Sequence, residues 1–129
     1  MISTTRFGTS DIARAKAFWG PITAMIGASV VRDRDDMIGY RGAEGSMLLI
    51  GIPLAGEHER GNGNMAGFQV ESRAMVDAVH ATALELGGSD EGAPGIRGSD
   101  ANGFYGAYFR DPDGNKLVAF RFGPPDTAD

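Results

Sequence analysis

The order of predicted secondary-structure elements repeats once along the chain, and this repeat restricts the fold more than any other feature. Each half reads as a strand, a helix and about three further strands, and the halves are offset by roughly sixty residues. The amino-acid identities repeat poorly, whereas the order of elements repeats well. One half cannot bury both the apolar side of its helix and the apolar face of its sheet, so we expect the two halves to pack as a pair. The predicted fold class is α+β, built from two βαβββ modules.

The length of 129 residues suits one ordinary domain that can bury a real core. We therefore predict a single domain over residues 1–129, with module one at about 1–55 and module two at about 63–122. The strand-like segments are ISTTRFGTS, ASVVRD, MIGYRG and SMLLIGI in module one, and MAGFQV, a weak segment around Ile96, FYGAYFR and KLVAFRF in module two.

The first predicted helix has clear start and stop signals. Ser10 is a good N-cap, with Asp11 just inside the helix where a negative charge suits the dipole. Gly27 can close the helix, although Pro21 is expected to end or kink it near Gly20. The apolar positions at helical spacing are Ile12, Ala15, Trp19 and Ile22.

The second predicted helix begins after Ser72, which is again a capping residue, and ends at Gly87 and Gly88. Trp19 in the first helix is expected to pack in the core rather than to contact a ligand. The apolar stripe of the second helix consists of Val76, Val79, Ala83 and Leu86.

Many of the 20 glycines fall in two stretches, residues 56–64 and 87–103. Neither stretch has helical or strand periodicity, so both are predicted to be loops. The first looks like a connector between the modules. The second is long for a compact domain, which favours a functional loop. The alternative, a flexible surface loop without a role, is left open.

The segment FRDPDGNKLVAFRF is predicted to form a hairpin. Asp111 to Gly114 suits a type I turn with Pro at its second position, and Gly114 supplies a left-handed residue. Asp111 and Asp113 also resemble a catalytic carboxylate pair, but turn formation is the commoner reason for Asp at such positions.

The net charge of -5 argues against a nucleic-acid partner, because neutralising phosphates requires a basic face. The chain has no apolar run of membrane-spanning length and no signal pattern at its start, so no membrane partner is expected. It has no cysteine, which excludes thiol catalysis and fits a reducing cytoplasm. No G-x-S-x-G motif is present either.

Three segments together resemble the vicinal oxygen chelate superfamily, which includes glyoxalase I, extradiol dioxygenases and the fosfomycin and bleomycin resistance proteins. They are FGTSDIARAKAFW, ESRAMVDAVHATALELGG and GFYGAYFRDPDGNKLVAF. The resemblance implies paired βαβββ modules that form two curved mixed sheets around a cleft. It also implies a homodimer, in which the modules pair either within one chain or between chains.

The resemblance implies a divalent metal held by His, Gln or Glu on matching strands of the two halves. Here the corresponding positions are Thr4, Met65 and Val118, with the fourth near Leu49 or Ile50. None of these is a usual ligand for a hard or borderline cation. We therefore expect neither a metal nor another cofactor.

The two histidines do not supply the missing metal ligands. His58 lies in the first glycine-rich stretch, where a solvated loop residue is the expected role. His80 lies on the second helix beside Val79, where we expect a capped or half-buried side chain. Neither is on a strand that the resemblance assigns to the metal.

An apolar cleft with few polar groups is the usual form of a small-molecule site. Arg6 could place its guanidinium on a ligand carboxylate or phosphate, or it could reach solvent or pair with an Asp. Tyr40 is a further residue that could stack on a ligand. The residues expected to line the cleft, from strand alternation and side-chain type, are Thr4, Arg6, Met65, Tyr105, Tyr108, Val118 and Phe120.

The predicted function is binding of a small organic molecule in an apolar cleft without the usual metal ligands. The alternative is a glyoxalase-like lyase or a dioxygenase-type enzyme with atypical or no metal ligands. A third possibility is an interaction protein with a vestigial cleft. The acidic chain suits a cationic ligand, whereas Arg6 suits an anionic one, so the sequence leaves the charge of the ligand open.

Overall fold

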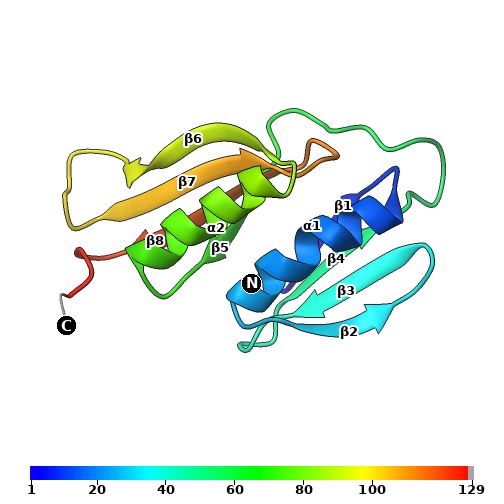
Figure 1. Cartoon of the computed structure of the whole chain (residues 1–129), viewed down its shortest axis with the longest axis horizontal. Helices are drawn as coiled ribbons and strands as arrows, with labels where there is room; N and C mark the ends of the chain where they lie inside the picture. The colour runs from blue at the N-terminus through cyan, green and yellow to red at the C-terminus, as the bar shows by residue number, and fades with distance from the viewer. Residues whose placement is uncertain (128–129) are drawn as a thin grey trace. The chain divides into compact units, whose positions relative to one another are not determined.

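The computed structural model describes residues 1–127, and the chain forms two compact units (Figure 1). The first unit comprises residues 1–63 together with 112–115. The second comprises residues 64–111 and the chain from Lys116 onwards. The turn at 112–115 therefore groups with the first unit, although module two was expected to contain it.

The first unit is a four-stranded sheet with one helix, in the order of elements that the sequence predicts. The strand order is β1-β4-β3-β2, with β1 parallel to β4 and the other pairs antiparallel. Its elements are β1 (Thr4–Gly8), α1 (Ile12–Met25), β2 (Ser29–Asp33), β3 (Met37–Arg41) and β4 (Met47–Gly51).

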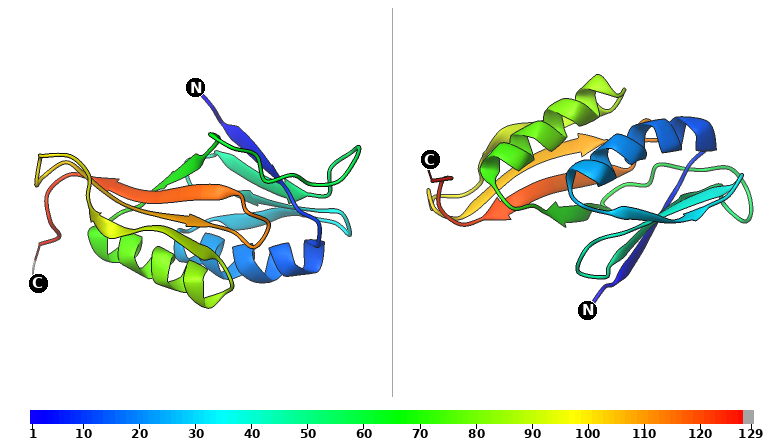
Figure 2. Two further views of the ribbon diagram at one scale, coloured as in Figure 1. Left: turned by 90° about the horizontal axis from the view of Figure 1, so that it is seen from above. Right: turned by 60° about the horizontal axis from the view of Figure 1, so that its bottom comes forward.

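Helix α1 covers one face of this sheet, as Figure 2 shows. Trp19 is completely buried, and its ring centroid lies 6.4 Å from that of Phe7 on β1. This confirms the expected core role of Trp19. The other large hydrophobic residues of this core are Phe18, Ile22, Ile38, Tyr40, Leu48 and Ile50.

The second unit repeats the arrangement. Its strand order is β5-β8-β7-β6, with β5 parallel to β8 and the other pairs antiparallel. Helix α2 covers one face of the sheet (Figure 2), where Val76, Val79 and Phe109 are fully buried. Its elements are β5 (Ala66–Gln69), α2 (Arg73–Glu85), β6 (Ser89–Ile96), β7 (Phe104–Arg110) and β8 (Lys116–Phe122).

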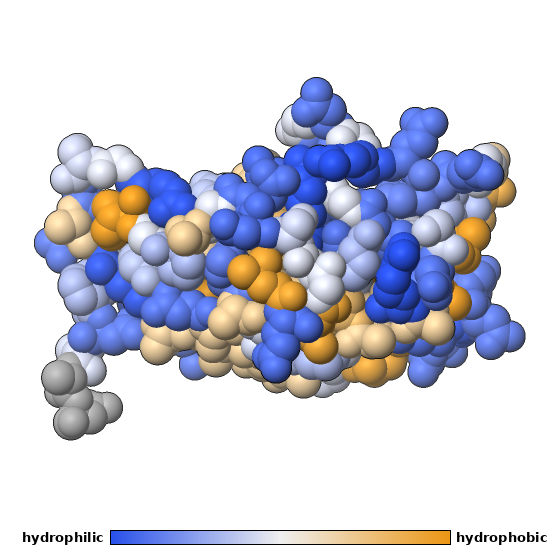
Figure 3. Space-filling model, turned by 45° about the horizontal axis from the view of Figure 1, so that its top comes forward, coloured by the Kyte–Doolittle hydropathy of each residue, from blue (hydrophilic) through white to orange (hydrophobic). Residues whose placement is uncertain are grey.

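These elements confirm the predicted α+β class with two mixed sheets. Ser72 caps α2 as expected, since its side chain accepts a hydrogen bond from the Met75 amide. In the view of Figure 3, hydrophilic residues occupy much of the surface and hydrophobic residues form separate patches. Within residues 1–127, no helix has the length and hydropathy needed to cross a membrane. The expected cytoplasmic location stays a prediction.

Two expectations about α1 were wrong. Asp11, not Ser10, is the N-cap, and its carboxylate accepts a hydrogen bond from the Arg14 amide. Pro21 does not end the helix, which continues to Met25. The residues directly after Pro21 are buried in the core, and this burial offsets the cost of proline in a helix, which is about 3 kcal/mol.

The stretch 87–103 was expected to be one long loop. This expectation was wrong, because Ser89–Ile96 forms β6. This strand pairs with β7 through an irregular register, with shifts between Asp90 and Gly92 and between Gly92 and Gly95. Such irregularities remove the alternation by which a strand is recognised in a sequence. Pairing with a neighbouring strand, rather than local propensity, makes this segment a strand.

Candidate functional site

The second unit has an aromatic cluster on the sheet face that α2 does not cover. The register pairs Phe104 with Phe122 and Tyr108 with Val118, and residues paired across strands point to the same side. Gly106 pairs with Phe120 on that side. The buried residues Ala107, Phe109, Leu117 and Ala119 alternate with these and point toward the helix. We call the side formed by Phe104, Tyr108, Val118, Phe120 and Phe122 the aromatic face.

Three phenylalanine rings form the apolar part of the aromatic face. The Phe104 and Phe120 rings stack with centroids 5.3 Å apart, and Phe122 meets Phe104 edge-on at 6.3 Å. Phe122 is 61% exposed, whereas Val118 is only 4% exposed. Partly exposed rings on a sheet offer an apolar surface against which a planar apolar molecule can pack.

Two glycines leave room for these rings. A β-carbon at Gly106 would lie 2.6 Å from the Phe104 ring, and one at Gly67 would lie 3.1 Å from the Phe120 ring. Both glycines lie beside Val118 in the sheet. A side chain at either position would displace a ring, so the absence of side chains there leaves space for the Phe104 and Phe120 rings.

Two cations flank Tyr108 on the same face. The Arg97 guanidinium lies 5.4 Å and the Lys116 ammonium 5.7 Å from the centre of the Tyr108 ring, within the range of a cation–π contact. Arg97 also donates hydrogen bonds to the carbonyls of Gly95 and Ala93. Within the part of the chain that the structure describes, neither cation forms an ion pair. The face therefore combines aromatic rings with positive charge.

Tyr105, expected in the cleft, lies on the other side of the sheet. Its hydroxyl donates a 2.6 Å hydrogen bond to Asp77 on α2, and the Arg73 guanidinium lies 4.9 Å from its ring centre. The hydrogen bond to Asp77, with desolvation, raises the pKa of Tyr105 to about 12. Tyr105 and Tyr108 are three positions apart in one strand, so they must point to opposite faces. The sequence alone therefore indicates that Tyr105 and Tyr108 cannot both line one face of the sheet.

Of the remaining expected residues of module two, Tyr108, Val118 and Phe120 come together on the aromatic face. Met65 precedes β5 and is 49% exposed. Sequence reasoning missed Phe104 and Arg97. Phe104 could have been found, because it lies four residues before Tyr108 and an even spacing places both on one face.

Thr4 and Arg6 lie in the first unit, on the side of β1 opposite the buried Phe7. Arg6 is exposed; it donates a 3.1 Å hydrogen bond to the carbonyl of Ile52, and its other terminal nitrogen lies 3.5 Å from the Met37 sulfur. Arg6 thus reaches across the end of β4 toward β3 within its own sheet. Tyr40, the further candidate, is buried in the core, and desolvation raises its pKa to about 12.

The side chains at the positions that correspond to family metal ligands do not fit a metal. Thr4 and Met65 are exposed, Val118 is buried among apolar groups, and Leu49 pairs with Arg6. Ile50 is completely buried in the core. Among residues 1–127, no group of three His, Asp or Glu side chains is placed to hold an ion. A hydroxyl and a thioether are weak donors for a divalent cation, so this donor set does not suit one.

Both histidines have structural partners. His80 is buried, and its Nε2 lies 2.9 Å from the carboxylate of Asp90. The Nε2 atom of His58 lies 3.0 Å from the carbonyl oxygen of Asp113, so His58 is anchored to the 112–115 turn rather than fully solvated as expected. The carboxylate of Asp113 binds Thr9, Ser10 and Arg14 in the first unit. These residues position the turn and leave no free acid–base pair there.

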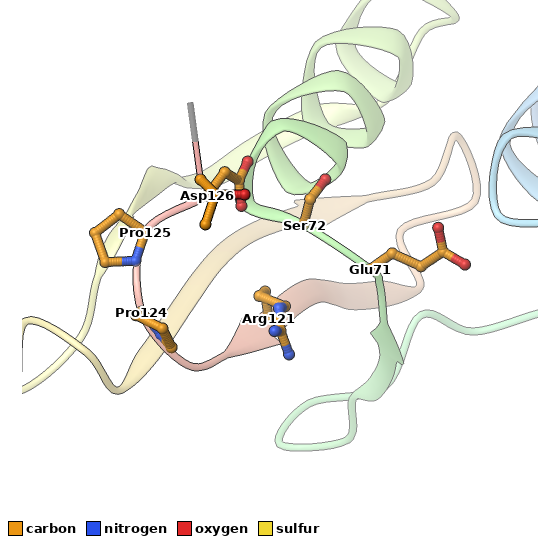
Figure 4. Close-up of a pocket in the computed structure, with 7 residues that line it drawn as sticks. Glu71, Ser72, Arg121, Pro124, Pro125 and Asp126 are labelled. Carbon is orange, nitrogen blue, oxygen red and sulfur yellow. The ribbon is translucent and has the colours of Figure 1, made fainter. Parts of the chain in front are cut away.

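A shallow groove lies beside the start of α2, where Asp126 from the chain end accepts hydrogen bonds from the amides of Arg73 and Ala74 (Figure 4). The helix N-terminus is therefore already occupied by a carboxylate of the protein itself. The residues that line the groove are Glu71, Ser72, Arg121, Pro124, Pro125, Asp126 and Thr127.

Comparison with known proteins identifies the superfamily to which this chain belongs. The model of the glyoxalase/bleomycin resistance protein/dioxygenase superfamily matches residues 2–119. The chain belongs to this superfamily. No curated protein matches it.

Solved structures agree with that membership. A glyoxalase/bleomycin resistance protein from Albidiferax ferrireducens is 30% identical, with a TM-score of 0.82 over 92% of this chain and 96% of the other. A glyoxalase-related enzyme from Fulvimarina pelagi is 15% identical, with a TM-score of 0.74 over 100% of this chain and 99% of that one. A family enzyme from Burkholderia phytofirmans is 17% identical, with a TM-score of 0.68 over 94% and 98% of the two chains. The latter two show similarity of fold.

Proposed function

We propose that this chain binds a small, planar organic molecule on the aromatic face and needs no metal to do so. The observation that carries the proposal is the stack of Phe104 and Phe120 beside the exposed ring of Phe122. Partly exposed aromatic rings on a sheet face lose water contact favourably when an apolar ligand covers them. The weak donor character of the family metal positions supports binding that does not depend on an ion.

A fluorescent probe tests this proposal. N-phenyl-1-naphthylamine is neutral and aromatic, and its emission rises in an apolar site. We expect saturable binding near one probe per chain, unchanged by EDTA. Replacing Phe120 by Ala removes one ring of the stack and should weaken binding about tenfold, whereas replacing the exposed Leu54 by Ala should have no effect.

Thermal unfolding of each variant separates lost binding from lost folding. Absence of saturable probe binding to folded protein would overturn the proposal. Equal binding by the two variants would place the ligand elsewhere. Conversion of a bound ligand to product would instead favour the enzyme alternative, a glyoxalase-like lyase or dioxygenase-type reaction.

We also propose that the chain works as a homodimer. Each unit has an open sheet with edge strands, β1 and β2 in the first and β5 and β6 in the second. Unpaired strand edges favour association. Sedimentation velocity at several concentrations tests this, and a purely monomeric species throughout would contradict it.

A further inference from the structure

We infer that the ligand of the aromatic face is an aromatic carboxylate, with its ring on Phe104 and Phe120 and its anionic group beside Tyr108, within reach of Arg97 and Lys116. This inference rests on the proposed function and specifies its ligand class. It assigns an anionic ligand, whereas the sequence left the charge of the ligand open.

The first argument is the arrangement of charge on this face. Arg97 and Lys116 both lie within about 6 Å of the Tyr108 ring centre, so their charges are no more than about 11 Å apart. An anion beside Tyr108 would be attracted by both charges. The neighbouring Arg110 is already neutralised, because its Nε donates a 2.6 Å hydrogen bond to Glu91.

The second argument is that the two cations are differently prepared for an anion. Arg97 is held in place by its hydrogen bonds to the Gly95 and Ala93 carbonyls, so little side-chain freedom is lost when it binds. Lys116 is a flexible point charge that can adjust to the ligand. Together they offer one fixed and one adaptable donor for a carboxylate.

The third argument is spacing. Tyr108 and Gly106 are two residues apart on β7, and the Phe120 ring is opposite Gly106. Same-face neighbours along a strand are about 7 Å apart. A carboxylate at the edge of a fused ring system lies a few ångström short of that distance from the ring centre, and the long side chains of Arg97 and Lys116 can cover the difference. A molecule with an aromatic body and one terminal carboxylate can therefore touch both parts of the face at once.

Competition between matched ligands tests the inference. With N-phenyl-1-naphthylamine as reporter, 2-naphthoate, neutral 2-naphthamide and cationic 2-naphthylmethylammonium compete for the site. We expect naphthoate to displace the reporter at about tenfold lower concentration than naphthamide, with the cation weakest. Raising NaCl from about 0.05 M to about 0.5 M should reduce this preference.

Charge-removing variants locate the preference. Arg97→Gln and Lys116→Gln should each reduce the naphthoate preference several-fold, and together they should abolish it, while binding of the neutral reporter persists. Arg34→Gln removes one exposed positive charge from the first unit and serves as the control. If the double variant fails to fold, amide chemical shifts in the wild-type protein take its place. Naphthoate should then shift Gly92, Gly106 and Tyr108 most strongly.

The failures of the two proposals are distinguishable. Absence of reporter binding would overturn the proposed function and the inference together. Reporter binding with equal competition by naphthoate and naphthamide would overturn the inference alone. A preference that survives in the folded double variant, or shifts centred away from Gly106, would also overturn it.

Discussion

The guanidinium of Arg14 on α1 lies 2.6 Å from the carboxylate of Asp113 in the turn between β7 and β8. The Asp113 carboxylate also accepts hydrogen bonds from the Thr9 hydroxyl and the Ser10 amide, and the side chain is only 2% exposed. Burial tends to raise the pKa of Asp113, but these hydrogen bonds and the Arg14 charge outweigh it and hold the pKa below its ordinary value. The second Asp of the turn is therefore a structural residue of the first unit.

Replacing Asp113 by Asn should lower the free energy of unfolding at neutral pH by about 1–3 kcal/mol, because an amide cannot accept all of these bonds. A carboxyl with a depressed pKa contributes stability that is present above its unfolded pKa and lost as the pH falls through the folded one. Wild-type stability should thus fall below about pH 4, and less so in the variant.

Urea unfolding from neutral pH to strongly acidic pH measures both effects. Asp35→Asn, at an exposed loop position, is the control and should follow the wild type. A variant with wild-type stability and wild-type acid sensitivity would show that Asp113 contributes nothing to either.

Gly20 lies inside α1, and a β-carbon there would meet no atom within 4 Å. Gly20→Ala should therefore raise the free energy of unfolding by about 0.5–1 kcal/mol, since alanine costs less entropy in a helix. Gly27 has equally open surroundings but a φ of +80°, so Gly27→Ala should destabilise. Thermal and urea unfolding of the pair would contradict this argument if both changes had the same sign.

Tyr40 and Tyr105 should ionise near pH 12 in the folded protein. Burial dominates at Tyr40, and the hydrogen bond to Asp77 dominates at Tyr105. Because the folded pKa values exceed the unfolded value of about 10, the stabilisation is present below pH 10 and is lost as the pH rises toward 12. Absorbance at about 295 nm follows tyrosinate formation.

In that titration Tyr105→Phe should remove one of the late-ionising groups and leave the other. Asp77→Asn, which removes the negative charge beside Tyr105, should move its ionisation to lower pH. An unchanged curve for both variants would contradict the assignment.

Restoring a carboxylate at Val118 should not create a metal site. The other corresponding positions, Thr4, Met65 and Leu49, still lack strong donors. Val118 is 4% exposed, so Val118→Glu should instead destabilise the protein by about 2–4 kcal/mol through burial of a charge among apolar side chains.

Melting with and without Mn, Ni, Zn, Fe and EDTA checks this for the variant and the wild type. Val118→Gln, a neutral residue of similar size to Glu, is the control for volume and polarity. A metal-induced rise in melting temperature that EDTA reverses would overturn the conclusion that the donor set is inadequate.

The overall fold could be predicted from local signals in the sequence. The Ser72 cap, the glycines after each helix and the turn at 111–114 mark where elements begin and end, and the order of elements then repeats. Each of these signals acts within a few residues, so it does not depend on the tertiary structure.

Features that depend on residues far apart in the sequence could not be predicted from it. β6 is a strand because Gly92 and Gly95 pair with β7, although glycine-rich segments have little strand propensity. Likewise, the contact of Arg97 with Tyr108 depends on how β6 lies against β7. The aromatic face was therefore predictable at Val118, Phe120 and Tyr108, and at Lys116 by alternation with Val118, but not at Arg97.

The grouping of residues 112–115 with residues 1–63 bears on how the chain folds during synthesis. Asn115 donates a 2.9 Å hydrogen bond to the carbonyl of Gly8, across 107 positions of sequence. A ribosome releases the first sixty residues long before this turn, so the first unit must wait, incomplete, for most of the chain to be translated. Domains usually fold in order from the N-terminus, but here the first unit can be completed only after β7 of the second has been translated. Late completion of the first unit is the consequence.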